Sequence, residues 1–262
     1  MRLSRYLGPL VALAVVCGVW EAVRILGALP PVILPPLADV WNATMHEPRF
    51  AFHVLVTLRE AFVGFVLGNA LAFMAAVAMV RWRFLETSIM PYAIALKTTP
   101  VAALAPILIL WLGGGWQANA AAAAAVAFFP TLVSLVRGLR LVDAPDHREF
   151  RDLFASWGVG WIKTLIYLRL PFSTPLLFSA LKVSSSLALV GAMVGEFISA
   201  NAGLGYLVVR YSRQLDTAHM FSAVIVSALV GVIWYYLVEA AELLFSRRMV
   251  DMGPHYITTG QQ

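Results

Sequence analysis

Four acidic residues recur at intervals of three in one polar stretch of the chain: Asp143, Asp146, Glu149 and Asp152. Carboxylates that repeat in this way could hold a metal ion through their oxygen atoms. Arg140, Arg148 and Arg151 are interleaved with them. Because guanidinium groups pair readily with carboxylates, this mixture favours an ion-paired, solvated surface over a metal site. We predict no metal site here, and the five scattered histidines show no metal-ligand spacing elsewhere.

A second candidate for chemistry is the segment 158–164, GVGWIKT, which has a glycine and a Lys-Thr pair, as a phosphate-binding loop would. Such a loop follows the pattern G-x-x-x-x-G-K-[ST], in which the backbone N–H groups of a glycine-rich turn surround the phosphates. Ile162 occupies the position of the last glycine. We therefore predict that this segment binds no ATP, that the chain needs no cofactor of its own, and that it is not an enzyme.

The composition is that of an integral membrane protein. Of the 262 residues, 61% are apolar and 13% are charged, against about 45–50% and about 25% in ordinary soluble proteins. The net charge of +5 is read as a topology signal, since basic residues of membrane proteins usually mark the cytoplasmic side. Nucleic acid is therefore not expected as a partner, whereas membrane lipid is. The single cysteine, Cys17, cannot form an intrachain disulfide.

Six stretches are long and apolar enough to cross a bilayer as helices, which takes about 20 residues each. We predict an all-α membrane protein with one membrane-spanning domain over residues 1–262. The spans cover about 6–29, 57–80, 89–112, 116–136, 172–197 and 219–245. The segment 30–56 contains five prolines and is too broken to span the membrane. The spacing of Leu37, Val40, Trp41 and Thr44 predicts a short helix there, lying on the membrane surface.

The distribution of lysine and arginine predicts the orientation, because cytoplasmic loops are enriched in both. One set of span ends holds twelve of them: Arg2, Arg5, Arg81, Arg83, Arg137, Arg140, Arg148, Arg151, Lys163, Arg169, Arg247 and Arg248. The other set holds five: Arg24, Arg49, Arg59, Arg210 and Arg213. We therefore expect both termini and the loop 137–171 on the cytoplasmic side, and the segment 30–56 on the periplasmic side.

A few polar or helix-breaking residues lie within the predicted spans. A lysine at the centre of a membrane helix costs about 2.5–3.5 kcal/mol on insertion, and such a charge usually faces protein or water. Prolines free backbone carbonyls that must be satisfied inside the bundle. Alternatively, Lys97 extends its amine to the membrane interface. The candidate pathway residues are Lys97, Pro100, Lys182, Ser185 and Glu196.

The loop 149–171, EFRDLFASWGVGWIKTLIYLRLP, has an internal order of its own. Phe150, Leu153, Phe154 and Trp157 follow the spacing i, i+3, i+4 and i+7, which places them on one face of a helix. Gly158 stands where a helix would end. A second helical spacing follows it, so the loop predicts a short amphipathic helix, a glycine break and a second helix leading into the fifth span.

This loop resembles the one that ABC-importer permeases carry at the same place, which begins Glu-Ala-Ala, has a glycine four residues after the second alanine and ends in Leu-Pro. Asp152 stands in for the glutamate, Leu153 and Phe154 replace the alanines, and Gly158 and Pro171 match. Two longer blocks add to the resemblance. The residues 97–106, KTTPVAALAP, followed by WLG at 111–113, and 195–206, GEFISANAGLGY, are similar to the subfamily that imports sulfonates, taurine, nitrate and pyrimidine or flavin precursors. The resemblance covers roughly residues 34–248.

The resemblance implies a type I ABC importer permease of the cell inner membrane, with two copies of this chain in the complex. ATP and Mg²⁺ would be bound by a separate cytoplasmic ATPase dimer, and a periplasmic or lipid-anchored binding protein would deliver the solute. Alternating access driven by ATP would then move the solute inward. The residues implied in coupling to the ATPase are Phe150, Arg151, Asp152, Leu153, Phe154, Trp157, Gly158 and Pro171.

Two other classes of protein compete with this interpretation. A secondary transporter or channel without an ATPase would normally show ionisable residues in several spans, and only Lys97, Lys182 and Glu196 qualify. A membrane-embedded enzyme would need clustered acids or histidines near an interface. The substrate is open among sulfonate, taurine, nitrate and pyrimidine precursors, which are small anionic or heterocyclic solutes.

Overall fold

A computed structural model of the protein describes residues 4–252, without the side chains of residues 4–7, 9, 10, 96, 97 and 245–252. Its regular elements are helices. The α-helices are α1 Ser4–Leu26, α2 Leu37–His46, α3 Phe50–Arg81, α4 Arg83–Thr98, α5 Val101–Leu112, α6 Trp116–Arg140, α7 Arg148–Ser156, α8 Trp161–Thr164, α9 Leu170–Ser199, α10 Leu204–Gln214 and α11 Thr217–Met252. Two 3₁₀ turns, η1 Leu141–Asp143 and η2 Pro145–His147, and one π-helical turn, η3 Leu165–Arg169, connect them.

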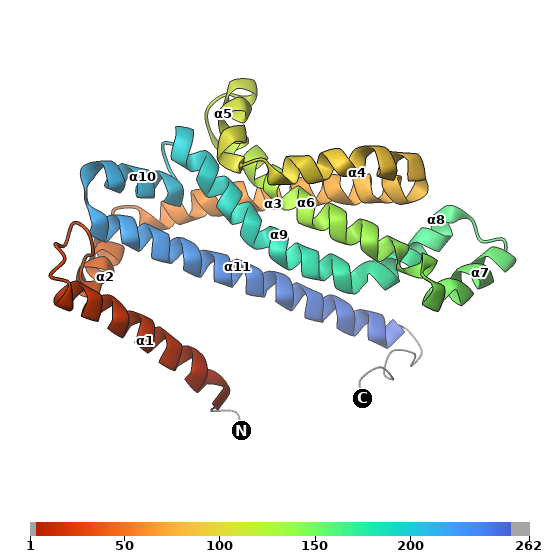
Figure 1. Ribbon diagram of the computed structural model, residues 1–262, viewed down its shortest axis with the longest axis horizontal. Coiled ribbons are helices and arrows are strands. Elements are labelled where there is room, and N and C mark those ends of the chain that lie inside the picture. The colour runs from red at the N-terminus through yellow and green to blue at the C-terminus, as the bar shows by residue number, and fades with distance from the viewer. Residues whose placement is uncertain (1–3, 253–262) are drawn as a thin grey trace.

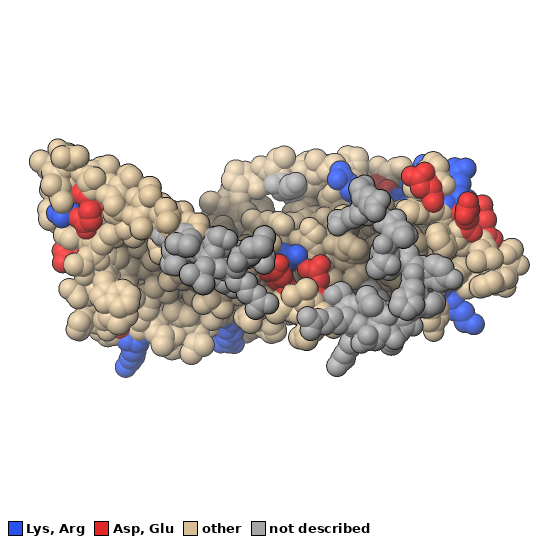
Figure 2. Space-filling model, turned by 90° about the horizontal axis from the view of Figure 1, so that it is seen from below, with Lys and Arg blue, Asp and Glu red and all other residues tan. Residues whose placement is uncertain are grey.

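Four helical segments in the described part of the chain are long and apolar enough to cross a membrane. They are Phe50–Arg81, Trp116–Asp143, Trp161–Ser199 and Thr217–Leu244. Figure 2 shows charged side chains at both ends of the face that it presents and a small group of both signs near its middle. The short helix predicted around Leu37 is α2, and a helix, α1, occupies the region of the first predicted span.

Helices α3, α6 and α9 pack together at the centre of the bundle (Figure 1). Helix α3 runs parallel to α6, and α9 returns antiparallel to both. Helix α11 lies along α9, whereas α2 and α10 lie at one end of the bundle and α7 and α8 at the other. We call these the α10 end and the α7 end. Helix α1 diverges from the bundle, and its contacts lie near its last turns, where the Trp20 ring packs edge-on against Phe221.

Small residues bring the three central helices close together toward the α10 end. A Cβ added to Gly68 of α3 would lie 2.5 Å from the Ala124 carbonyl oxygen of α6. A Cβ added to Gly191 of α9 would lie 2.8 Å from Ala123 Cα on the same helix α6. The alanine run of α6 thus lies between two glycine-bearing faces, one from α3 and one from α9. Small residues of this kind permit close contact between membrane helices.

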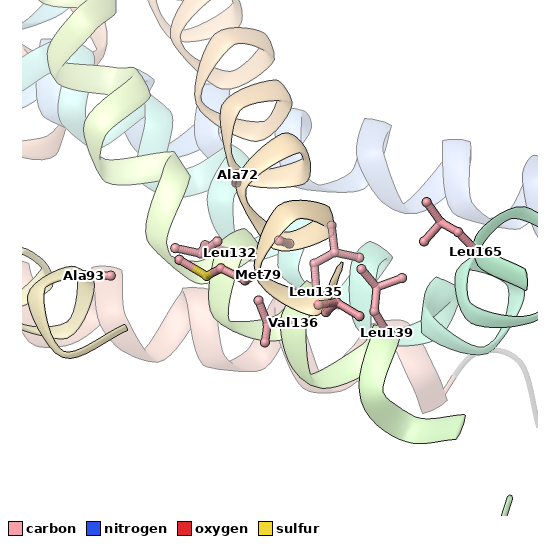
Figure 3. Packing of buried hydrophobic residues seen from close by; sticks show 10 residues of the cluster. Ala72, Met79, Ala93, Leu132, Leu135, Val136, Leu139 and Leu165 are labelled. Atoms are coloured by element: carbon pink, nitrogen blue, oxygen red, sulfur yellow. The ribbon is translucent and has the colours of Figure 1, made fainter. Parts of the chain in front are cut away.

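Toward the α7 end, larger apolar side chains take over the packing (Figure 3). The buried cluster there consists of Ala72, Ala76, Met79, Val80, Ala93, Leu132, Leu135, Val136, Leu139 and Leu165. It joins α3, α4, α6 and η3, so the C-terminal halves of α3 and α6 are tied to the start of the helix that leads into α9. The segments on either side of the α7 loop, the end of α6 and η3, are therefore both packed into this apolar core.

The predicted third span, 89–112, is divided between two helices. Helix α4 begins earlier, at Arg83, and ends at Thr98, and α5 begins at Val101. Pro100 has extended backbone angles, φ −60° and ψ 126°. The ring of a proline disfavours the helical conformation in the residue before it, so the helix stops ahead of Pro100 and restarts after it. Hydropathy alone does not register this break, because the apolar stretch continues through it.

Candidate functional site

Helix α7 carries large apolar side chains that the rest of the described chain leaves largely uncovered. Its predicted face is present: Phe150, Leu153 and Trp157 are 47%, 43% and 69% exposed, and no residue of α7 is buried. The Phe150 ring contacts Phe172 with centroids 5.5 Å apart, and the Phe154 ring contacts Trp157 at 6.2 Å. These contacts orient the face without covering it. An exposed row of this kind marks a surface that binds another molecule.

Gly158 ends this helix in the left-handed conformation that the sequence predicts, with φ +66°. Its N–H donates to the Ala155 carbonyl at 3.0 Å, and the next N–H, of Val159, donates to the Phe154 carbonyl at 3.1 Å. These two bonds make up a Schellman motif, which satisfies the last carbonyls of a helix and turns the chain sharply. The turn therefore fixes the direction in which α7 leaves toward α8.

A network of ion pairs attaches α7 to the ends of α6 and α9. Asp143 of η1 accepts two hydrogen bonds of 2.9 Å from the Arg169 guanidinium of η3. Arg151 of α7 approaches the same carboxylate at 3.9 Å, and Arg140 of α6 approaches it at 3.7 Å. The exposed Asp152 contacts Arg151. The interleaved charges predict ion pairing here, and the structure adds that the arginines around Asp143 make its carboxylate a link between α6, α7 and η3.

The helix that follows the Gly158 turn is continuous into the membrane but contains one widened turn. Helix α8 passes directly into the π-helical η3 and then into α9. Pro171 lies just after η3, near the start of α9. Proline lacks an N–H and its ring crowds the carbonyl four residues earlier, so a widened turn before it relieves the clash within an unbroken helix. The side chain of Arg169 leaves from this turn to reach Asp143.

At the α10 end, a polar face of α3 holds the turn between α9 and α10. His53 and Thr57 are four residues apart and both are buried. The Gly203 N–H donates to His53 Nδ1 at 3.0 Å, and the Leu204 N–H donates to the Thr57 hydroxyl at 2.8 Å. Two backbone donors at the start of α10 are thereby satisfied by side chains of α3, which fixes α10 across the end of the bundle.

Two buried glutamates lie beside this turn. Glu196 of α9 accepts a 2.6 Å hydrogen bond from the Thr57 hydroxyl and a 2.5 Å bond from the Gly205 N–H. Glu60 of α3, one turn further along the same face, accepts a 3.1 Å bond from the Asn119 side-chain amide of α6. The glutamates and their partners therefore connect all three central helices to α10.

Further polar contacts support the same arrangement. The Asn69 side-chain oxygen of α3 accepts bonds from the hydroxyls of Thr131 on α6, at 2.5 Å, and Ser184 on α9, at 3.1 Å. At the α10 end the Tyr211 hydroxyl donates to the Glu47 carboxylate. Burial and this hydrogen bond raise the pKa of Tyr211 to about 12, so the hydroxyl keeps its proton and the contact persists at physiological pH.

The chain matches a known protein family over most of its length. Residues 68–251 match the model of the family described as the binding-protein-dependent transport system inner membrane component. The matched region includes α7, the Gly158 turn, α9 and the Glu196 turn. The protein belongs to this family of membrane-embedded ABC transporter permeases.

Individual relatives of known name agree with the family. The riboflavin transport system permease protein RibX of Chloroflexus aurantiacus is 32% identical over 245 residues, which are 92% of this chain and 90% of that protein. The formylaminopyrimidine transport permease protein ThiX of Halalkalibacterium halodurans is 29% identical, over 86% of this chain and 88% of that protein. A putative aliphatic sulfonates transport permease protein, SsuC of Bacillus subtilis, is 27% identical, over 83% and 79%.

A solved structure shares the fold of this permease. A chain from a crystal structure titled as an amino acid ABC transporter with histidines superposes with a TM-score of 0.58 at 17% sequence identity. The alignment covers 76% of this chain and 93% of that chain. This supports the permease fold and, at such identity, nothing about the solute.

The structure gives the candidate pathway residues of the permease different surroundings. Lys182 of α9 forms an ion pair of 2.7 Å with Glu242 of α11. Ser185 is fully buried and donates to the Lys182 carbonyl at 2.7 Å, and Glu196 is buried in the cluster described above. Pro100 is exposed at the break between α4 and α5, and the side chain of Lys97 lies outside the described residues. Lys182, Ser185 and Glu196 therefore all have partners within the chain.

Several residues of these sites were not singled out from the sequence. Glu60 and Thr57 stand at the polar start of the second span, where they read as ordinary interfacial residues. Glu242 follows a long apolar stretch and gives no sign that it pairs with Lys182. One pattern in the sequence indicates that Thr57 and Glu60 are buried. Positions 53, 57, 60, 64 and 68 are spaced so that they all lie on one face of helix α3.

Proposed function

We propose that this permease is the membrane subunit of an ATP-driven importer and that α7 is the element through which an ATPase drives it. The supporting observation is the exposed apolar face of α7, held in a fixed direction by the Gly158 turn and by ion pairs to Asp143. The face would lie in a groove of a cytoplasmic ATPase, with Arg151 and Asp152 at its rim. No ATP or Mg²⁺ site is required in this chain.

The contacts of α7 provide a route by which its movement would reach the membrane. Arg151 and Arg169 both meet Asp143, so α7 is linked to the end of α6 and to the widened turn before α9. Helices α3, α6 and α9 are packed backbone to backbone and would move as one body. The Lys182–Glu242 ion pair would carry the movement to α11. Closure of the ATPase dimer would therefore reorient most of the bundle.

The energies involved are sufficient for such a coupling. Burying an aromatic or leucine side chain contributes about 1.5–3 kcal/mol, and three such side chains on α7 are partly exposed now. Inward-open and outward-open states need differ by only a few kcal/mol for a ligand to shift their populations. A docked α7 would thus be held firmly enough to transmit the change rather than detach.

We further propose six spans with both termini cytoplasmic. The twelve-to-five distribution of lysine and arginine supports this orientation. Cysteines placed at Ser156 and at Ala202, in a Cys17→Ser background, should react with membrane-impermeant reagents from opposite sides of the membrane. Reaction of both from the outside would exclude this topology.

The proposed assembly contains two copies of this chain, an ATPase dimer and a binding protein that delivers the solute from outside. The relatives are named for riboflavin, formylaminopyrimidine and aliphatic sulfonates. We propose a small heterocyclic or anionic solute of this range, moved by alternating access, with the choice among them made largely by the binding protein.

The decisive experiment places a charge in the centre of the α7 face. Phe154→Asp should release the ATPase and abolish transport, because a carboxylate buried unpaired in an apolar groove costs several kcal/mol. The protein should still reach the membrane at normal levels, since α7 lies outside the spans. Copurification of the ATPase with the detergent-solubilised variant, together with solute-stimulated ATP hydrolysis, measures the effect.

Ala155→Asp is the matched control, because it adds the same charge one residue later, on the side of α7 away from the apolar face. It should retain the ATPase and most of the stimulation. If Phe154→Asp also retains both, α7 is not the coupling element and the proposal fails.

A further inference from the structure

Glu60 and Glu196 lie close together inside the bundle, because Thr57, whose hydroxyl bonds to Glu196, stands one turn from Glu60 on α3, and both glutamates are only 1% exposed. In the part of the chain that the structure describes, neither forms an ion pair with a lysine, arginine or histidine. Two ionised carboxylates side by side, removed from water and without a counter-charge, would be strongly unfavourable. Something must therefore compensate the charge at this site.

The hydrogen bonds favour Glu196 as the ionised member. One of its oxygens accepts from the Gly205 N–H and the other accepts from the Thr57 hydroxyl. The Thr57 hydroxyl itself accepts from the Leu204 N–H, and its single proton has two acceptors in reach, Glu196 at 2.6 Å and the His53 carbonyl at 3.3 Å, of which Glu196 is the nearer. Donors thus occupy both oxygens of Glu196, as suits a carboxylate, which accepts hydrogen bonds and donates none.

Glu60 lacks the donors that a carboxylate would need. One of its oxygens accepts from the Asn119 amide, whereas the other, Oε2, is buried without a donor from the protein. The Asn119 oxygen lies toward Gly195, where a Cβ would be only 2.7 Å from it. Turning the amide over would leave Oε1, the Glu60 oxygen that now accepts from it, facing an acceptor instead. Either orientation of Asn119 leaves Glu60 in need of a proton of its own.

The surrounding elements supply no other neutralising charge in contact with the pair, among the residues that the structure describes. On α3, Arg59 lies next to Glu60 in the sequence, and its guanidinium lies over the Trp116 ring, 4.2 Å from the centroid. His53 accepts the Gly203 N–H through Nδ1, so that nitrogen carries no proton. From α6 the pair receives the neutral Asn119, and from α10 it receives a backbone N–H group, whereas Arg210 and Arg213 of α10 line a pocket beside Glu196 without forming an ion pair with it.

We propose that Glu60 and Glu196 form a site for a single proton, which Glu60 carries and donates to the Glu196 carboxylate. The protonated pair would bridge α3 and α9 next to the turn that starts α10. Since the same Glu196 carboxylate holds the Gly205 N–H, the proton would also secure α10 to the bundle. Loss of that proton would place two negative charges together and loosen the turn. This assignment is independent of whether α7 binds an ATPase.

Infrared spectroscopy of the purified full-length protein tests the proton directly. A protonated carboxylic acid has a C=O stretching band that ionised carboxylates lack and that shifts in D₂O. At neutral pH we expect such a band in the wild type and its loss in Glu60→Gln, which replaces the neutral acid with a neutral amide of the same shape. Asp39→Asn, at an exposed carboxylate of α2, should leave the band unchanged. Persistence of the full band in Glu60→Gln would overturn the assignment.

Thermal melting of the two glutamine variants tests which residue carries the proton. Glu60→Gln should melt close to the wild type, because an amide can donate to Glu196 as the acid does. Glu196→Gln should melt much lower, because an amide NH₂ would face the Gly205 N–H or the Thr57 hydroxyl. Should Glu196→Gln not fold, Thr57→Val, which removes one donor to Glu196, should also melt below Glu60→Gln.

The reverse order of stability would contradict the proposal. So would a rise in the wild-type melting temperature on adding Na⁺ or K⁺ that Glu60→Gln abolishes, because the pair would then hold a metal cation instead of a proton.

Discussion

At the α7 end of the bundle, charged and apolar side chains are presented outward, whereas at the α10 end the polar groups are turned inward. The α7 end has ion pairs around Asp143 and a helix with no buried residue. The α10 end has Glu60, Thr57 and Glu196 fully buried, with neutral donors bound to them. The first arrangement can change partners at little cost, but the second cannot, because separating its groups would leave buried polar atoms unsatisfied.

The glycines at the two ends show the same contrast. Gly158 has open space around it and is required only for its left-handed backbone. Gly205 lies within α10 and has no positive φ, but a Cβ there would lie 2.7 Å from the Met193 carbonyl oxygen and 2.8 Å from Glu196 Oε2. Gly158 therefore sets the direction of the chain after α7, whereas Gly205 permits close packing between α9 and α10. The comparison suggests that the α7 end moves as an attached lever, whereas the α10 end behaves as part of the bundle.

Gly205→Ala at the α10 end should reduce stability more than the same substitution of Gly158 or Gly160 at the α7 end, where an added Cβ has nothing within 4 Å. Overpacking a rigid site costs about 1–3 kcal/mol, and disturbing a hydrogen bond to the charged Glu196 adds about 1.5–3 kcal/mol. We expect a clear drop in melting temperature in detergent and less folded protein in the membrane.

Gly160→Ala provides the matched control at the α7 end. Gly160 has φ −64° and nothing within 4 Å of an added Cβ, so the same substitution should be nearly neutral there. Equal melting temperatures for Gly205→Ala and Gly160→Ala would remove the distinction between the two ends.

Local features of both ends could be predicted from the sequence. The spacing from Phe150 to Trp157 and the glycine after it specify an amphipathic helix and its end, because periodicity and capping depend on neighbouring residues. The close packing of Gly64, Gly68 and the alanine run also follows from residue size alone. The matched family then confirmed the class of protein.

Contacts between distant residues could not be predicted in this way. Thr57 and Glu196 are 139 positions apart, and no local sequence pattern indicates that their side chains form a hydrogen bond. The sequence predicts Lys182 and Glu196 as pathway residues, because a charge in a span usually faces protein or water, and this role stays a prediction. The structure gives Lys182 an ion pair and places Glu196 in a buried cluster, and in each case the partner comes from another helix.

Gly158→Val should have a smaller effect, confined to the α7 end. A β-branched residue in the left-handed region is strained by about 1–2 kcal/mol, so the Schellman turn after α7 should open and the helix should lose its fixed direction. Melting temperature and membrane insertion should stay close to the wild type, while solute-stimulated ATP hydrolysis falls several-fold. Gly158→Asn is the informative companion, because asparagine tolerates this conformation and should retain most of the stimulation. If both variants are equally impaired, a feature of this position other than its backbone conformation matters, and the account of α7 as a lever aimed by Gly158 is wrong.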